Sequence, residues 1–523
     1  MSVLQDSSAA RKSGADSNGL TSPTLIVAAL FSLALVSLPL IYLFKRAGQS
    51  DVETLKLIIF RAKTLEVLFT TVALVASVAL LATIVGFGIA WSLHYLKLPF
   101  PNVIRALAVL PIAIPSYVFT YSYLSLDLFP GGFLAAVTVL TLSTAPYVIL
   151  ASIAALRRID SSQIDVAQTL GLNQFQILVR ITLPQVRNAL SAGALLVSLY
   201  VLSDFGAVSL LGVDTFTRAI QNTYQGSFDR SGAAVLALML VAVSSLVISL
   251  ETSTRRRSRL IRSSVSITRK PDQIQTLKVR FIATSLISIY LVSALFAPLA
   301  VLIYRFFTRP EPINVPGLTH AAVSTVMVSS LGAAIALILA LPVAILALRA
   351  SALGRVAERG VLLVNALPGI VMGLALVAVG SDFPWAYQTI GLLALSYSIL
   401  FLARSVGSIR NSLARVPENL TEIAATLGQS KSRIFYRITL PLAAPGVLTG
   451  TLLVFLSAMK ELPATLMLRP TGFETLATEI WNNTAIFRFS EAAPYALLLV
   501  AIAAIPTFLI SRPDQGSERG ELQ

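Results

Sequence analysis

The sequence contains no cysteine and only two histidines, His94 and His320. The missing cysteines exclude disulfides, thiolate metal sites and cysteine nucleophiles, and two histidines so far apart predict no histidine-based metal site. Charge is scarce too, since 12% of the 523 residues are Asp, Glu, Lys or Arg, against about 25% in a typical soluble domain. The dipeptide Gly-Lys is also missing, so the chain lacks a Walker A phosphate-binding loop. We therefore expect no metal, no catalytic site and no cofactor on this chain.

Hydrophobic residues make up 55% of the chain, so lipid must replace water around much of it. A spanning helix needs roughly 20 mostly apolar residues, and the runs lack the alternation of a membrane β-barrel. We predict an all-α integral membrane protein with twelve spans, at 24–44, 66–93, 104–126, 133–156, 189–211, 232–250, 282–304, 321–348, 361–380, 389–409, 446–466 and 492–510.

The net charge of +15 lies in loops between the apolar runs, which argues against nucleic-acid binding and for a membrane topology. Counting Lys and Arg per loop predicts cytoplasmic N- and C-termini in a plasma (inner) membrane. One loop disagrees, because 45–65 carries five basic residues on the predicted outer side.

An internal repeat organises the chain. Residues 165–184 read DVAQTLGLNQFQILVRITLP and residues 422–441 read EIAATLGQSKSRIFYRITLP, 257 residues apart. The same offset pairs Pro111 with Pro368 and Asp204 with Glu461. Two copies of six spans each keep the same orientation, so the repeats are parallel.

The repeat and its flanks give five segments. We predict a disordered cytoplasmic tail at 1–22, a first repeat at 23–254, a basic cytoplasmic linker at 255–280, a second repeat at 281–511 and a C-terminal tail at 512–523.

The repeated segment lies between the fourth and fifth span of each half, and local rules predict a helix, a break and a second helix. Ser161 or Ser162 would cap the first helix and Pro417 would begin its twin. Glycines at 171 and 428 follow leucine where a helix needs a left-handed residue. Asn173 and Ser430 would cap the next helix, and Pro184 and Pro441 would end or kink it.

The spacing E-A-A, three residues, G, nine residues, I-x-L-P resembles the signature loop of binding-protein-dependent ABC import permeases, and it occurs twice here. The first copy has Asp165 and Val166 for Glu and Ala, and the second has Ile423 for the first Ala. In that family the loop forms a coupling helix that sits in a groove of the ATPase. The resemblance implies that an ABC ATPase dimer in the cytoplasm binds ATP and docks on Asp165, Ala167, Gly171, Glu422, Ala424 and Gly428, while Pro184 and Pro441 shape the loop.

The resemblance also implies an extracytoplasmic substrate-binding protein, and a fused two-copy layout is shared by ferric-iron and thiamine permeases. The stretches DFGAVSLLGVDTFTRAIQNTY and KELPATLMLRPTGFETLATEIW look like the ferric-iron group. Thiamine or another small solute is the alternative cargo. A secondary carrier is a further alternative, but the loop LHYLKLPFPNVIR lacks the charged pattern expected there.

Two acids lie within apolar runs, Asp204 and Glu461, and such residues usually face a cavity or a partner. Two carboxylates on equivalent helices could line a cation path. Alternatively Lys460 neutralises Glu461 and Asp204 bonds a neighbouring helix. Prolines Pro111, Pro115 and Pro368 could bend spans three and nine, and the tyrosines at 117, 121 and 123 could offer phenol oxygens or lie at the membrane boundary.

Overall fold

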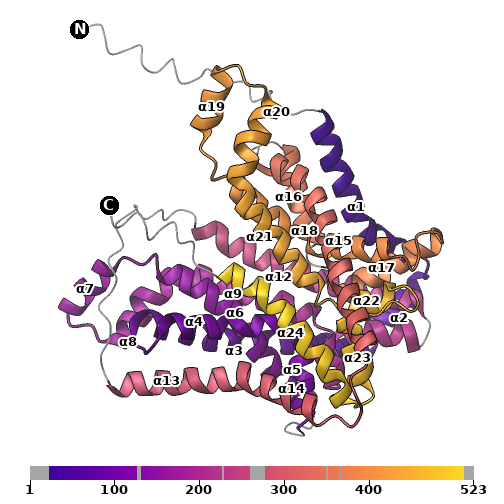
Figure 1. The fold of residues 1–523 in the computed structure, drawn as a ribbon, viewed down its shortest axis with the longest axis horizontal. Helices are drawn as coiled ribbons and strands as arrows, with labels where there is room; N and C mark the ends of the chain where they lie inside the picture. The colour runs from indigo at the N-terminus through magenta and orange to yellow at the C-terminus, as the bar shows by residue number, and fades with distance from the viewer. Residues whose placement is uncertain are drawn as a thin grey trace.

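The computed structural model describes residues 23–126, 131–226, 229–258, 277–348, 352–364 and 367–511, and these fold into helices joined by loops (Figure 1). The expected tails at 1–22 and 512–523 lie outside the described residues, as does most of the linker. Helices enter the linker from both sides, because one ends at Ser258 and the next begins at Leu277.

The first half contains α1 (Pro23–Ala47), α2 (Val52–Ile59), α3 (Ala62–Tyr95), α4 (Pro101–Val109), a 3₁₀ turn η2 (Leu110–Ala113), α5 (Ser116–Leu124), α6 (Gly132–Leu156), α7 (Ser161–Thr169), α8 (Gln174–Ile177), a π turn η3 (Leu178–Thr182), α9 (Leu183–Ser203), α10 (Gly206–Leu210), α11 (Phe216–Gln221), a π turn η4 (Asn222–Gly226) and α12 (Arg230–Ser258).

The second half contains α13 (Leu277–Leu291), a π turn η5 (Val292–Phe296), α14 (Ala297–Phe307), α15 (Val315–Leu348), α16 (Ala352–Val364), α17 (Gly369–Asp382), α18 (Ile390–Leu413), α19 (Glu418–Thr426), α20 (Lys431–Ile434), a π turn η6 (Phe435–Thr439), α21 (Leu440–Ala458), α22 (Pro463–Leu468), α23 (Leu476–Ala485) and α24 (Phe489–Ser511).

Ten helices of the described residues are long and apolar enough to cross a membrane. They match ten of the twelve predicted spans. The other two are broken: a 92° bend separates Pro101–Ala113 from Ser116–Leu124, and the equivalent span of the second half is divided between α16 and α17. The predicted bend in span three is therefore confirmed, while span nine is divided into two helices and its bend stays a prediction.

Proline accounts for the position of both breaks. Pro115 precedes α5 and Pro368 precedes α17, each with an extended backbone that starts the new helix. Pro115, rather than Pro111, is thus the structural counterpart of Pro368. The constant offset of 257 residues fails here because the intervening segments differ in length.

Each half packs around three long helices, α3, α6 and α9 in the first and α15, α18 and α21 in the second. An equivalent hydrogen bond occurs in each half. Thr71 of α3 accepts from the Phe216 amide at 3.1 Å, and Thr325 of α15 accepts from the Leu476 amide at 2.8 Å. Both partner amides lie at the start of the helix that follows the fifth span. The repeat is thus structural as well as sequential.

The first helix of each half packs on the other half. Helix α1 contacts α15, α16 and α17, while α13 and α14 lie against α3, α4 and α5 (Figure 1). Hydrogen bonds hold α13 and η5 against the first half. Tyr123 donates to the Ser293 carbonyl at 2.5 Å, and Tyr290 donates to the Ala108 carbonyl at 3.3 Å. Because each half packs its first helix on the other half, the two halves form one unit.

The loop at 45–65, whose basic residues contradict the charge rule, has acidic neighbours. Lys45 pairs with Asp382 of the second half at 2.8 Å, and Lys63 pairs with Asp214 at 2.7 Å. Local carboxylates thus balance part of the positive charge of this loop.

Close helix packing in the first half depends on a glycine. A Cβ atom at Gly86 would lie 2.7 Å from the Val148 Cβ and 2.9 Å from the Ala145 carbonyl oxygen on α6, whereas a Cβ at Gly88 meets nothing within 4 Å. We expect Gly86→Ala to destabilise the protein by about 1–3 kcal/mol through overpacking. Gly88→Ala should leave stability unchanged or raise it, because alanine is the better helix former.

Thermal unfolding of the two purified variants in detergent provides the comparison. An equal fall in melting temperature for both would contradict the packing argument, since only Gly86 faces another helix.

Candidate functional site

The two repeated loops lie at the ends of the two lobes of the molecule, α7 with α8 on one and α19 with α20 on the other (Figure 1). In each loop the first helix ends in the same way. Gly171 and Gly428 have φ of +79° and +76°, the left-handed conformation that glycine adopts without strain. The amides of Leu172 and Gln429 then donate back to the carbonyls of Ala167 and Ala424, each at 3.1 Å, forming a Schellman motif.

The starts of these helices differ partly from the prediction. Asp160, not Ser161 or Ser162, caps α7 by accepting from the Ser162 amide at 3.0 Å. Pro417 precedes α19 as expected. Asn173 forms a capping box with Gln176 at the start of α8, and Ser430 accepts from the Arg433 amide at 3.4 Å, so both predicted caps of the second helix are confirmed.

Pro184 and Pro441 do not end the helix. One apolar helix runs through each proline, over Gln174–Ser203 and Ser432–Ala458. A π turn precedes each proline at the same place in the repeat, η3 and η6. The residue before the proline donates five residues back, Leu183 to Leu178 and Leu440 to Phe435. The widened turn thus accommodates proline, so the predicted end of the helix is wrong, while the alternative, a kink, stays a prediction.

Ala167 and Ala424, two of the predicted contact residues, are buried. Their exposed fractions are 3% and 6%. Ala167 packs in a small core with Ile164, Ile177 and Val186, which anchors the loop to the ends of the long helices. Ala167 therefore supports the loop from beneath and Ala424 is similarly buried, while contact of these two residues with the ATPase stays a prediction. Glu422 is exposed and Asp165 is half-buried.

Large apolar residues occupy the exposed face instead. Leu170 is 75% exposed and Leu427 is 73% exposed, and each follows another exposed apolar residue by four positions, Val166 and Ile423. Residues four apart share one helix face, and both pairs keep the 257-residue offset. The sequence carried this signal, because the two pairs occupy matched positions in the repeat.

The acids Asp204 and Glu461 lie at breaks that the sequence analysis missed. Helices α9 and α21 end at Ser203 and Ala458, and short helices begin at Gly206 and Pro463. The predicted spans 189–211 and 446–466 are thus each interrupted near the acid. Glycine and proline two residues after each acid were the signal for the break.

Both acids cap the short helix that follows them. Asp204 accepts from the amides of Ala207 and Val208 at 3.0 and 3.3 Å, and Glu461 accepts from the Ala464 amide at 3.0 Å. Partial positive charge at a helix N-terminus favours such anions. The short helix is thereby held against the end of the long one.

Each acid also reaches the broken third span of its own half. Ser116, the first residue of α5, donates to the Asp204 carboxylate. Gly369, the first residue of α17, lies so close that a Cβ atom there would overlap the Glu461 carboxylate. The two acids thus join equivalent breaks, which agrees with the hypothesis that Asp204 bonds a neighbouring helix.

Lys460 does not pair with Glu461 in the described part of the chain. Its ammonium donates to the carbonyl of Ile112, in the other half, at 2.9 Å. Ile112 belongs to η2, at the end of a half-helix, where orphan carbonyls favour a cation. The alternative in which Lys460 neutralises Glu461 is therefore wrong.

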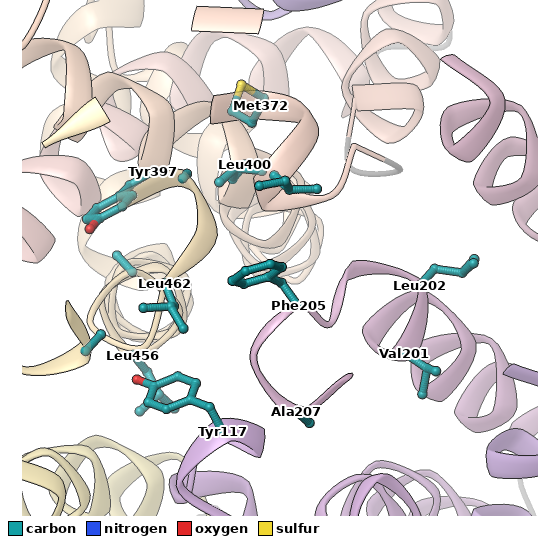
Figure 2. Close-up of a cluster of buried hydrophobic side chains, with 14 of the residues drawn as sticks. Tyr117, Val201, Leu202, Phe205, Ala207, Met372, Tyr397, Leu400, Leu456 and Leu462 are labelled. Carbon is teal, nitrogen blue, oxygen red and sulfur yellow. The ribbon is translucent and has the colours of Figure 1, made fainter. Parts of the chain in front are cut away.

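An apolar cluster closes the space between the halves at this level. Figure 2 shows Tyr117 of the first half directed toward Leu456 and Leu462 of the second, with Phe205 between the halves. Phe205 and Leu462 directly follow the two acids and are 3% and 1% exposed. The Phe205 ring lies 5.2 Å from the ring of Trp481. Phe205 and Leu462, which are equivalent residues of the two repeats, thus belong to one apolar cluster with Tyr117 and Leu456. We call this cluster the plug.

The predicted tyrosines serve the contact between the halves rather than the membrane boundary. Tyr121 is fully buried and donates to the Phe489 carbonyl at 2.7 Å. Tyr117 is 4% exposed, and its hydroxyl has no hydrogen-bond partner among the residues that the structure describes. The described residues hold no cluster of three or more His, Asp or Glu side chains that could bind a metal.

Known proteins resemble this chain over most of its length. A family model described as "Binding-protein-dependent transport system inner membrane component" matches residues 82–260 and again 332–512. An Fe(3+)-transport system permease protein of Haemophilus influenzae is 30% identical over 482 residues, covering 91% of this chain and 95% of that protein.

Shorter matches involve other transport systems. A putative 2-aminoethylphosphonate transport system permease protein of Salmonella typhimurium is 27% identical, over 28% of this chain and 56% of its own. A molybdenum transport system permease protein of Haemophilus influenzae is 38% identical, over 19% of this chain and 49% of its own.

Proposed function

The chain belongs to the family of inner-membrane components of binding-protein-dependent transport systems, and from that premise we propose that it carries ferric iron into the cell. It is the multi-pass permease subunit of an ABC importer, and its relatives are permease subunits, not enzymes. The cargo proposal is supported by the similarity to a ferric-iron permease along nearly the whole of both chains. The relatives from other systems match only part of the chain.

The observation that carries the mechanism is the pair of exposed apolar faces on the two loops. Leu170 and Leu427 are exposed at matched sites of the two repeats. Exposed apolar patches of this kind mark surfaces that a partner covers. We infer that an ABC ATPase dimer docks there, on the cytoplasmic side, and that it binds the ATP. Its closure would move both loops, and with them the helices α9 and α21 that continue from them.

The other end of those helices explains how this motion reaches the path. Each continuous helix runs from a loop to an acid-capped break beside the apolar plug. A displacement of the loops would therefore move Phe205 and Leu462. These two residues separate the two sides of the membrane. We propose that an extracytoplasmic binding protein delivers the cargo on the opposite face, with both chain termini in the cytoplasm.

Uptake of radiolabelled ferric iron tests the cargo. A strain without its own ferric-iron permease is complemented with this chain together with its ATPase and binding protein. We expect ATP-dependent iron accumulation and no gain in thiamine uptake. Thiamine accumulation without iron accumulation would refute the cargo proposal, while leaving the permease assignment intact.

A further inference from the structure

Two cationic side chains of the second half, Arg404 and Lys460, form no ion pair with a carboxylate among the described residues. The Arg404 guanidinium donates to the Ser457 hydroxyl and lies over the Phe401 ring, 5.0 Å from its centroid. Lys460 donates only to the Ile112 carbonyl. No ion pair in the described part of the chain includes either residue.

The depth of Arg404 makes its exposure informative. It lies nine residues, about two and a half turns, before the cytoplasmic end of α18, and it is exposed. A charged side chain at such depth is costly against lipid and almost always faces a cavity or a partner. Its charge is within electrostatic range of Tyr147 in the other half, of Lys460 and of Glu461. We therefore place Arg404 on the wall of the path between the halves.

The two acids at this level cannot serve as counter-ions without giving up their present bonds. Asp204 is held by two amides and Ser116, and Glu461 by the Ala464 amide. The acids accept hydrogen bonds from helix N-termini, and neither forms an ion pair with Arg404 or Lys460 among the described residues, although the charge of Arg404 also acts on Glu461.

The equivalent positions of the first half carry uncharged side chains. Tyr147 and Tyr200 occupy the positions equivalent to Arg404 and Ser457, at the same 257-residue offset. Their rings lie 5.9 Å apart. The repeat has thus diverged at these positions, so that two phenol groups of the first half stand where the second half has Arg404 and its hydroxyl partner Ser457, and Ser203 stands where it has Lys460. A symmetric structural role would not require this difference.

We propose that Arg404 and Lys460 form an oxyanion subsite, and that ferric iron passes through it together with an anionic oxygen ligand. The proposal rests on the ferric-iron function proposed above. A bare trivalent cation would be repelled by both side chains, whereas a bound oxyanion would form ion pairs with both, which neither forms with a described carboxylate. Arginine and lysine are the usual binders of such groups, arginine in a bidentate manner. No bond is made or broken in this step.

Anion binding to the purified transporter provides the first test. Radiolabelled inorganic phosphate is added to the complex of permease and ATPase without nucleotide, and equilibrium dialysis measures its binding. We expect saturable binding by the wild type, at least a tenfold loss of affinity in Arg404→Gln and in Lys460→Met, and partial retention in Arg404→Lys and Lys460→Arg. Lys63→Gln, which removes an exposed cation elsewhere, should bind as the wild type does.

Transport into proteoliposomes provides the second test. Labelled iron is presented on the binding protein with labelled phosphate or with labelled citrate, and the entry of both labels is counted. About one anion should enter per iron in the wild type, and the neutral variants should lose iron entry at least tenfold while still binding the ATPase.

The outcomes separate the two proposals. Iron entry without either anion, or wild-type phosphate binding in the neutral variants, would overturn the oxyanion subsite. Phosphate binding that depends on Arg404 and Lys460, with no iron transport by the wild type, would refute the iron function and keep the subsite. Should the neutral variants fail to fold, absence of phosphate binding by the wild type would still overturn it.

Discussion

Replacing Leu170 and Leu427 together with glutamate should abolish capture of the ATPase by the permease. Each leucine is about three-quarters exposed in the free chain and would be buried in the complex. Burying a leucine is worth about 1.5–3 kcal/mol, so losing two would weaken binding by at least 100-fold. Glutamate adds the cost of burying a charge without a partner. Co-purification on a tagged ATPase measures the loss.

The matched control is Leu57→Glu on α2, a leucine that is 72% exposed and lies outside both loops. This variant should bind the ATPase normally. The loop variants should keep their fold, because neither leucine belongs to the small core beneath α7. Retained ATPase binding by a folded double variant would remove these faces from the interface and leave the docking proposal without its main support.

Local sequence rules were enough to predict the order helix, glycine, capped helix in both loops, though not the cap of α7 or the continuous helix through the prolines. The caps at Asn173 and Ser430 and the left-handed Gly171 and Gly428 depend on residues only a few positions apart. The side that each residue faces could not be read in the same way. Ala167 was expected at a surface, but whether an alanine lies above or beneath a helix depends on packing with distant helices.

The exchange of α1 and α13 between the halves was not predictable from hydropathy. In lipid, the surface of a helix that faces another helix is about as apolar as the one that faces the bilayer, so the pattern does not identify the neighbour. The breaks near Asp204 and Glu461 were missed for a related reason. Irregular backbone is tolerated at membrane depth when protein surrounds it, and an average over 20 residues hides a gap of two to four.

Replacing Asp204 and Glu461 together with alanine should reduce iron uptake at least tenfold while the ATPase remains bound. Each acid caps a short helix beside the plug, and loss of an N-cap costs about 0.5–2 kcal/mol. The Ser116 hydroxyl would also lose its acceptor. The short helices that carry the residues next to Phe205 and Leu462 would then be free to shift, so the plug would no longer follow α9 and α21.

The double variant Asp204→Asn with Glu461→Gln separates this positioning role from direct binding of the cargo. An amide oxygen still accepts from Ala207, Val208 and Ala464, so a positioning role predicts uptake within about threefold of the wild type, and asparagine remains a good N-cap. A cargo ligand would need the charge, so the amide variant would then fail as severely as alanine. Uptake of labelled iron by the two variants, at equal amounts of membrane-inserted protein, distinguishes the roles. The structure favours the positioning role, because both carboxylates already accept hydrogen bonds from the N-termini of short helices.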